Sequence, residues 1–203
     1  MDKTSICNQA LAQLASSAEL SNVDTDRPKE AQVCRLFYDT ARDAVLRAFP
    51  WPFATKLGAL TLVQADPNDE WDFSYAYPAD SLEFRRILNA SRVRVDTHSS
   101  RTPYRIVGDD VQRLILTDMV DAQGEWTTRI LDPEQFAPDF VIALQFYLAS
   151  LIAPRVTAGD QFKLGNACMQ QYQFAIRRAQ MTAAREEQAD DLPDAEMILF
   201  REG

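Results

Sequence analysis

Hydrophobic side chains recur every three or four positions in four stretches of the chain, which predicts four amphipathic helices. The first is expected to begin at an N-terminal cap, Thr4. The second runs from about Lys29 to Phe49 and stops before Pro50, because proline cannot continue the helical hydrogen-bond ladder. A third follows Pro133 and ends within 154–157, and a fourth covers about 160–188. The expected core positions are Ile6, Cys7, Ala10, Leu11 and Leu14; Ala31, Cys34, Phe37, Tyr38, Ala41, Val45 and Ala48; Phe136, Phe140, Leu144, Tyr147, Leu148, Leu151 and Ile152; and Phe162, Leu164, Cys168, Tyr172, Ala175, Ile176 and Ala179.

Between these helix pairs the hydrophobic period shortens to two, which is typical of half-buried β-strands. Strands are expected over 57–63, 73–77, 84–89, 104–107, 113–117 and 125–131, with turns at Gly108-Asp109-Asp110 and Gln123-Gly124. The polar stretch 90–103 is expected to be an exposed loop or a mobile hairpin. Arg35, Asp39, Arg42 and Arg47 are expected on the solvent side of the second helix.

This order of elements predicts an α+β protein. Residues 1–54 and 132–188 would form a four-helix bundle, residues 55–131 an inserted antiparallel β-rich subdomain, and residues 189–203 an extended C-terminal arm. The most apolar run, Val141–Ala153, is shorter than a membrane span requires, so we expect a buried helix and no membrane partner. The N-terminus shows no signal-peptide pattern, and we expect synthesis in the cytoplasm.

Charge narrows the range of functions. The 203-residue chain has 21 basic and 30 acidic residues, a net charge of −9, which argues against a protein that grips nucleic acid through a basic face. From residue 182 onward there are seven acidic and two basic residues, and these surround the apolar run Met197, Ile198, Leu199 and Phe200. This run either packs back on its own domain or forms an arm that docks on another chain.

The sequence offers little catalytic chemistry. His98 is the single histidine and lies among polar residues, and Cys7, Cys34 and Cys168 have neither zinc-ligand spacing nor an even number for disulfide pairing. We therefore expect buried thiols, and no catalytic residue, cofactor or metal. An acidic cluster surrounds Trp71 and consists of Asp66, Asp69, Glu70 and Asp72. It could supply paired carboxylates for catalysis, but we expect it to form a solvated turn.

Two further groups are candidates for contacts. Trp51 and Phe53 lie between prolines at the end of the second helix, where a large ring serves either as a core anchor or as an inter-subunit contact. Arg92, Arg94, Arg101 and Arg105 form the one notable basic cluster, which is either solvated or in contact with an acidic partner surface.

Several of these segments resemble the tail tubular protein A family and related head-to-tail adaptors of tailed bacteriophages. The resemblance spans roughly residues 6–180, and family members usually carry Asn at the position of Pro52. The matching segments are Ile6-Cys7-Asn8-Gln9-Ala10-Leu11, Cys34-Arg35-Leu36-Phe37-Tyr38-Asp39, Pro50-Trp51-Pro52-Phe53-Ala54, Tyr75-Ala76-Tyr77-Pro78-Ala79-Asp80, Ile115-Leu116-Thr117-Asp118 and Phe136-Ala137-Pro138-Asp139-Phe140.

The resemblance implies a structural protein of the virion. Such adaptors form a ring, commonly of twelve subunits, that joins the portal protein to the tail nozzle or tail tube protein and lets the genomic DNA pass without specific binding. A helical bundle with a β-rich extension is the implied fold, and the apolar run 197–200 would dock on the portal.

The alternative to this structural function is a peptidoglycan-cleaving virion hydrolase that uses paired carboxylates.

Overall fold

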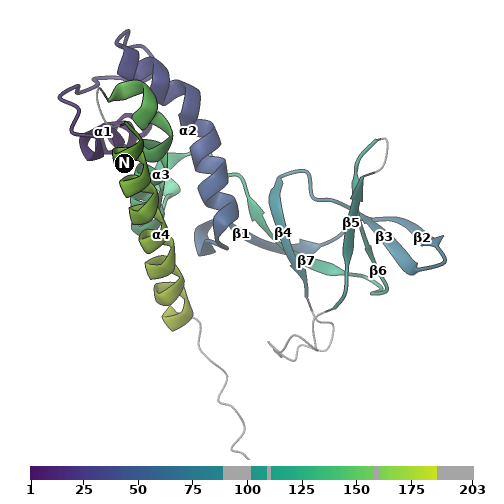
Figure 1. Cartoon of the computed structure of the whole chain (residues 1–203). Helices are drawn as coiled ribbons and strands as arrows, with labels where there is room; N and C mark the ends of the chain where they lie inside the picture. The colour runs from purple at the N-terminus through teal and green to yellow at the C-terminus, as the bar shows by residue number, and fades with distance from the viewer. Residues whose placement is uncertain (89–101, 109–110, 158–160, 187–203) are drawn as a thin grey trace, which may run out of the picture.

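A computed structural model describes residues 1–88, 102–108, 111–157 and 161–186 of the chain. This part is a mixed α and β protein with a helical side and a β side (Figure 1). The helices are α1 (Lys3–Gln13), α2 (Lys29–Ala48), α3 (Pro138–Val156) and α4 (Gln161–Glu186), with short 3-10 turns at Pro52–Ala54 and Pro133–Gln135. The strands are β1 (Thr55–Ala59), β2 (Leu62–Asn68), β3 (Trp71–Ala76), β4 (Ser81–Ile87), β5 (Arg105–Gly108), β6 (Arg113–Thr117) and β7 (Gln123–Thr128).

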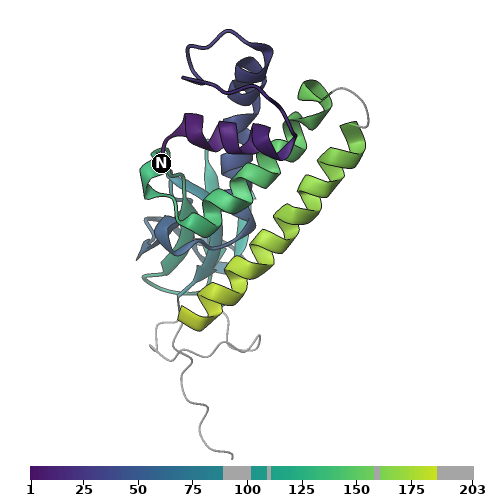
Figure 2. The same ribbon diagram turned by 90° about the vertical axis from the view of Figure 1, so that its left-hand side faces the viewer.

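The helical side is built around α3, which packs against α1, α2 and α4 (Figure 2). This arrangement follows from the composition of α3, which is apolar on nearly all sides and must be covered on several of them. α2 also touches β4 and β7, whereas α4 packs mainly along α3. The order from the sheets outward is therefore α2, α3 and α4.

By length and composition alone, α3 could also cross a membrane. The core helix of a globular protein passes the same test, and α3 contributes eight buried residues to the helical core. The expectation of a buried helix agrees with this packing.

The strands form two antiparallel sheets rather than one. Their orders are β1-β7-β4 and β2-β3-β6-β5. Leu60, Tyr75, Phe84, Ile115 and Trp126 belong to a small hydrophobic core between the strands, separate from the helical core. Strands β2 and β5 are the edges of the four-stranded sheet.

Helix positions agree with the hydrophobic pattern, but two polar details of that prediction were wrong. The N-cap of α1 is Asp2, whose carboxylate accepts a hydrogen bond from the Ser5 amide at 2.9 Å. Thr4 instead accepts one from the Val23 amide, 3.2 Å away. Arg42, expected in solvent, is only 6% exposed, because its guanidinium pairs with the carboxylates of Asp39 and Asp43, each at 2.8 Å.

Core positions depart from the predicted stripes at the helix ends. Ala48 at the end of α2 and Leu164 at the start of α4 are exposed, because neither position is covered by a neighbouring helix. The side chain of Phe162 lies outside the described residues.

Two strand predictions also needed correction. The expected strand 57–63 is divided between β1 and β2, which belong to different sheets. The expected turn at Gln123-Gly124 lies inside β7, where Gly124 pairs with Gly58. A Cβ atom on Gly124 would come within 2.6 Å of the Phe84 ring, so glycine at this position makes room for an aromatic side chain rather than forming a turn.

The expected hairpin between 104–107 and 113–117 is confirmed, because β5 pairs with β6 and Gly108 stands opposite Arg113. Its two turn residues, 109 and 110, lie outside the described residues. The same holds for residues 90–101 of the expected loop and for the proposed arm, 189–203.

Candidate functional site

The Trp51 corner, Pro50–Ala54, which ends one of the segments compared with the adaptor family above, lies where the helical side meets the sheets. Trp51 is only 2% exposed, and its indole Nε1 donates a hydrogen bond to the Val45 carbonyl of α2 at 2.8 Å. Its ring meets the rings of Phe49 and Phe140 edge to face, with centroids 5.0 and 5.2 Å apart. The structure therefore places Trp51 in the core, between the end of α2 and the start of α3.

Phe53 extends this aromatic contact. Its ring centroid lies 5.3 Å from that of Phe140 and 6.1 Å from that of Phe136, at the entrance to α3. Phe53 is partly buried and packs against the helical core. The aromatic cluster thus joins the two ends of the β insertion, because Phe53 precedes β1 and Phe136 follows β7.

Polar contacts hold the same junction from the sheet side. The half-buried Arg85 of β4 donates from Nη2 to the carbonyls of Leu46 and Arg47, at 3.3 and 2.8 Å, and from Nε to the Thr127 hydroxyl at 2.9 Å. These carbonyls belong to the last turn of α2, where a cation is favoured by the helix dipole. Burial lowers the pKa of Arg85.

Asp80 makes a second set of contacts, within the three-stranded sheet. Its carboxylate accepts hydrogen bonds from Lys56 Nζ at 2.6 Å, from Trp126 Nε1 at 3.1 Å and from the Thr128 hydroxyl at 3.3 Å. The hydrogen bond from Lys56 is the largest cause of a lowered Asp80 pKa. On the helix side, Arg129 pairs with Asp43 at 3.0 Å. The sheet is therefore bound to α2 by directional contacts as well as by the aromatic cluster.

Only one member of the predicted arginine cluster can be placed. Arg105 begins β5, is exposed, and lies 3.7 Å from the Glu70 carboxylate of its own chain. Arg92, Arg94, Arg101 and the nearby His98 lie outside the described residues, as do Met197, Ile198, Leu199 and Phe200 of the expected arm.

The acidic cluster lies on and around the hairpin between β2 and β3. Asp66, Asp69, Glu70 and Asp72 are all exposed, and Asp69 and Glu70 occupy the turn itself. Asn68 organises this turn, because its side-chain oxygen accepts hydrogen bonds from the amides of Glu70 and Trp71. The exposure fits the expected solvated turn, whereas the acid of a glycosidase lies in an apolar pocket.

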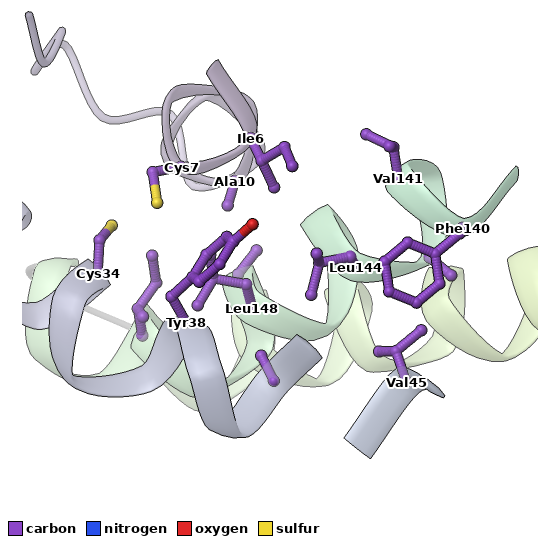
Figure 3. Close-up of a cluster of buried hydrophobic side chains, with 14 of the residues drawn as sticks. Ile6, Cys7, Ala10, Cys34, Tyr38, Val45, Phe140, Val141, Leu144 and Leu148 are labelled. Carbon is purple, nitrogen blue, oxygen red and sulfur yellow. The ribbon is translucent and has the colours of Figure 1, made fainter. Parts of the chain in front are cut away.

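The three cysteines are buried and free. Cys7 of α1 and Cys34 of α2 point toward each other across the helical core (Figure 3). The hydrogen bond with Cys34, and then burial, raise the pKa of the Cys7 thiol, and burial raises that of Cys168, whereas the hydrogen bond with Cys7 lowers the pKa of Cys34. The raised pKa values disfavour the nucleophilic thiolate at Cys7 and Cys168. In the described residues no group of three His, Cys, Asp or Glu side chains could hold a metal ion.

One exposed apolar surface was not predicted from the sequence. The outer face of α4 exposes Phe174 and Met181, which are 60% and 66% exposed. The sequence signal for this face was the spacing of seven residues between them, together with the fact that neither lies on the predicted core stripe.

Comparisons with protein-family models and with curated proteins find no match for this chain.

Proposed function

We propose that this protein is a structural, non-enzymatic head-to-tail adaptor of a bacteriophage, which acts in a ring at the junction of portal and tail. One observation carries the proposal. Residues 50–54, which end the block of the second helix that resembles the adaptor family, lie at a junction that Trp51 ties to the helical side and Arg85 ties to the sheet side. An adaptor that transmits force between two partners needs such a fixed angle between its parts.

The layout of the described residues supports the same role. In the proposal the helices act as one four-helix bundle around α3, and the β insertion extends from it toward a second partner. The portal protein would bind at one side of the ring, and the tail nozzle or tail tube protein at the other. The protein would be made in the host cytoplasm and reside in the virion.

Charge fits the passage of DNA. Each subunit carries a net charge of −9, so a ring of them repels DNA phosphates and offers little nonspecific affinity to a duplex that must slide. The C-terminal segment combines acidic residues with the apolar run Met197–Phe200. In the proposal the acidic residues keep this arm soluble and the apolar run anchors it on the portal.

Electron microscopy of the purified chain, alone and mixed with the portal, tests this function. We expect monomers alone and rings on the portal. Removal of residues 193–203 is expected to abolish docking while the far-ultraviolet circular dichroism of the monomer stays unchanged. A matched variant that replaces only the acidic residues of this segment with their amides keeps the apolar run and should still dock.

Normal docking of the truncated chain would contradict the role of the arm, and the absence of rings on portals would contradict the adaptor function. Release of muropeptides from peptidoglycan, abolished by Asp69→Asn, would establish the hydrolase alternative in its place. Retention of the chain on DNA at physiological salt would also overturn the proposal, because an adaptor must let DNA slide.

A further inference from the structure

The outer face of α4 is basic and apolar, although the chain has a net charge of −9. Phe174, Arg177, Arg178 and Met181 follow the spacing i, i+3, i+4, i+7, which places all four side chains on one face of the helix. All four are exposed. The whole helix has four basic residues and one acidic residue, against a net charge of −9 for the chain. Arg177 and Arg178 make no ion pair within the part of the chain that the structure describes.

The hairpin of β2 and β3 has the opposite character. From Leu62 to Ala76 the sequence contains four acidic residues and no basic one. Glu70 pairs with Arg105 of β5 at 3.7 Å, so the negative charge of the hairpin rests mainly on Asp66, Asp69 and Asp72. Its first strand is an edge strand, and Leu62 and Val63 on it are 52% and 46% exposed. An edge strand with exposed apolar side chains is a natural contact surface for another chain. The hairpin therefore offers exposed apolar groups at the start of β2 and negative charge toward its turn, whereas α4 offers apolar and positive groups on one face.

These two surfaces lie at opposite ends of the molecule. Figure 1 shows the tip of β2 and β3 pointing away from the helices, and in Figure 2 the helices lie in front of the sheets, with α4 alongside α3. Because α2 makes the main helix contacts with the sheets and α4 packs along α3, α4 lies on the far side of the helical layer. Within one chain the two surfaces are held apart, whereas two copies can bring them together.

We propose that the basic face of α4 in one copy binds the acidic β2–β3 hairpin of a second copy. The partner of each surface is thus another copy of this chain, bound head to tail. Such a heterologous contact leaves one surface free at each end of a pair, so it continues from copy to copy and closes into a ring when the rotation per copy permits. The inference deepens the proposed function, on which it rests for ring closure, by naming the contact between neighbouring subunits.

Opposite charge explains why this pairing is preferred over others. Two α4 faces would bring arginines together, and two hairpins would bring carboxylates together, so like pairings are repelled. The mixed pairing also covers part of the Phe174 and Met181 side chains, which removes exposed apolar surface from water. We expect a weak contact that is sensitive to salt.

Charge reversal with sedimentation equilibrium of the full chain at concentrations up to about 1 mM tests the contact. Arg177→Glu/Arg178→Glu and Asp69→Lys/Asp72→Lys are each expected to weaken self-association by about tenfold, because each places like charges together. Combining all four substitutions in one chain restores opposite charges and is expected to return the association constant to within about threefold of the wild type.

The matched control is Arg27→Glu/Lys29→Glu, which changes the net charge by the same amount on the exposed N-terminal side of α2. It should leave association within about twofold of the wild type, since it touches neither surface. An absence of association in the wild type at 1 mM would overturn the proposal. So would an effect of the α4 reversal no larger than that of the control, or a failure of the combined variant to recover.

Two further measurements separate the remaining explanations. The acidic segment 187–203, which has six acidic residues and one basic residue, could itself cover α4. If a chain ending at Glu186 loses self-association while the hairpin reversal does not, that segment is the occupant and the proposal is wrong. Portal docking is measured separately, so loss of self-contact with intact docking overturns this inference alone, and lost docking with intact self-contact overturns the proposed function alone.

Discussion

Replacing Arg85 with Met tests whether the junction between the sheets and α2 depends on directional contacts. Methionine keeps an unbranched apolar stem of similar length but removes the guanidinium donors to Leu46, Arg47 and Thr127. A hydrogen bond from a charged donor contributes about 1.5–3 kcal/mol. The Arg47 carbonyl lies near the surface, where water can replace the donor, whereas the Thr127 hydroxyl is buried and loses its partner. We therefore expect a loss of about 2–4 kcal/mol in the free energy of unfolding.

Urea unfolding followed by tryptophan fluorescence and circular dichroism measures this loss, as a shift in midpoint with an unchanged slope. Arg47→Met is the matched control at the same junction. Arg47 pairs with Glu83 at 2.9 Å, but both side chains are exposed, so its removal should cost about 0–1 kcal/mol. If the two variants lose the same stability within about 0.5 kcal/mol, the junction is held by apolar packing and the reasoning is refuted.

Three other predictions use the same unfolding assay. Tyr38→Phe removes a buried hydroxyl without a partner in the described residues, so stability should stay equal or rise by up to about 1 kcal/mol, and a clear loss would contradict this. Gly124→Ala forces a Cβ to within 2.6 Å of an aromatic ring and should cost about 1–3 kcal/mol, whereas Gly108→Ala, with nothing within 4 Å, should cost less than about 0.5 kcal/mol. The Asp80 pKa is lowered by Lys56, so its carboxylate stabilises the fold above the ordinary pKa of 3.8, and the deficit of Asp80→Asn should be present at neutral pH and shrink as the pH falls below that value.

The helices could be predicted because the buried face of a helix follows from the spacing of hydrophobic residues every three or four positions. The stripe through Ala31, Cys34, Ala41 and Val45 is buried, and α2 ends one residue before the predicted end. Caps and buried charges were harder, because they depend on atoms that periodicity does not describe. Asp2, and not Thr4, caps α1. Arg42 is buried, and its guanidinium pairs with the carboxylates of Asp39 and Asp43.

The sheets were less predictable, because a strand finds its partner far along the chain. Nothing in the alternation of residues 57–63 indicates that β1 pairs with β7 while β2 pairs with β3. The turn predicted at Gly124 was wrong for a related reason, because the partner of this residue is also distant in the sequence. Glycine is a turn signal in sequence, yet this one makes space for the ring of Phe84, which lies 40 positions earlier in the chain.

Part of the candidate site was visible in the sequence. The Trp51 corner was identified from its prolines, and the structure decides between core and surface by burying the ring against Phe140. The exposed face of α4 was missed, because the sequence pattern does not show that Phe174 and Met181, which lie off the predicted core stripe, stay uncovered until the position of α3 is known. A periodic pattern shows which side of a helix is most apolar, but it does not show how much of that side a neighbour covers.

The distribution of charge bears on how an acidic protein can associate with itself at all. A uniform net charge of −9 would repel every approach of two copies equally, and any contact would have to overcome it. Concentrating positive charge on α4 and negative charge on the β2–β3 hairpin makes one orientation attractive and leaves the like pairings repulsive. Repulsion therefore selects the orientation as much as attraction does. Because the two surfaces lie at opposite ends of the molecule, the selected contact favours an open-ended or ring assembly over a two-fold dimer. Because screening weakens attraction and repulsion together, added salt should reduce the preference for this orientation as well as the strength of the contact.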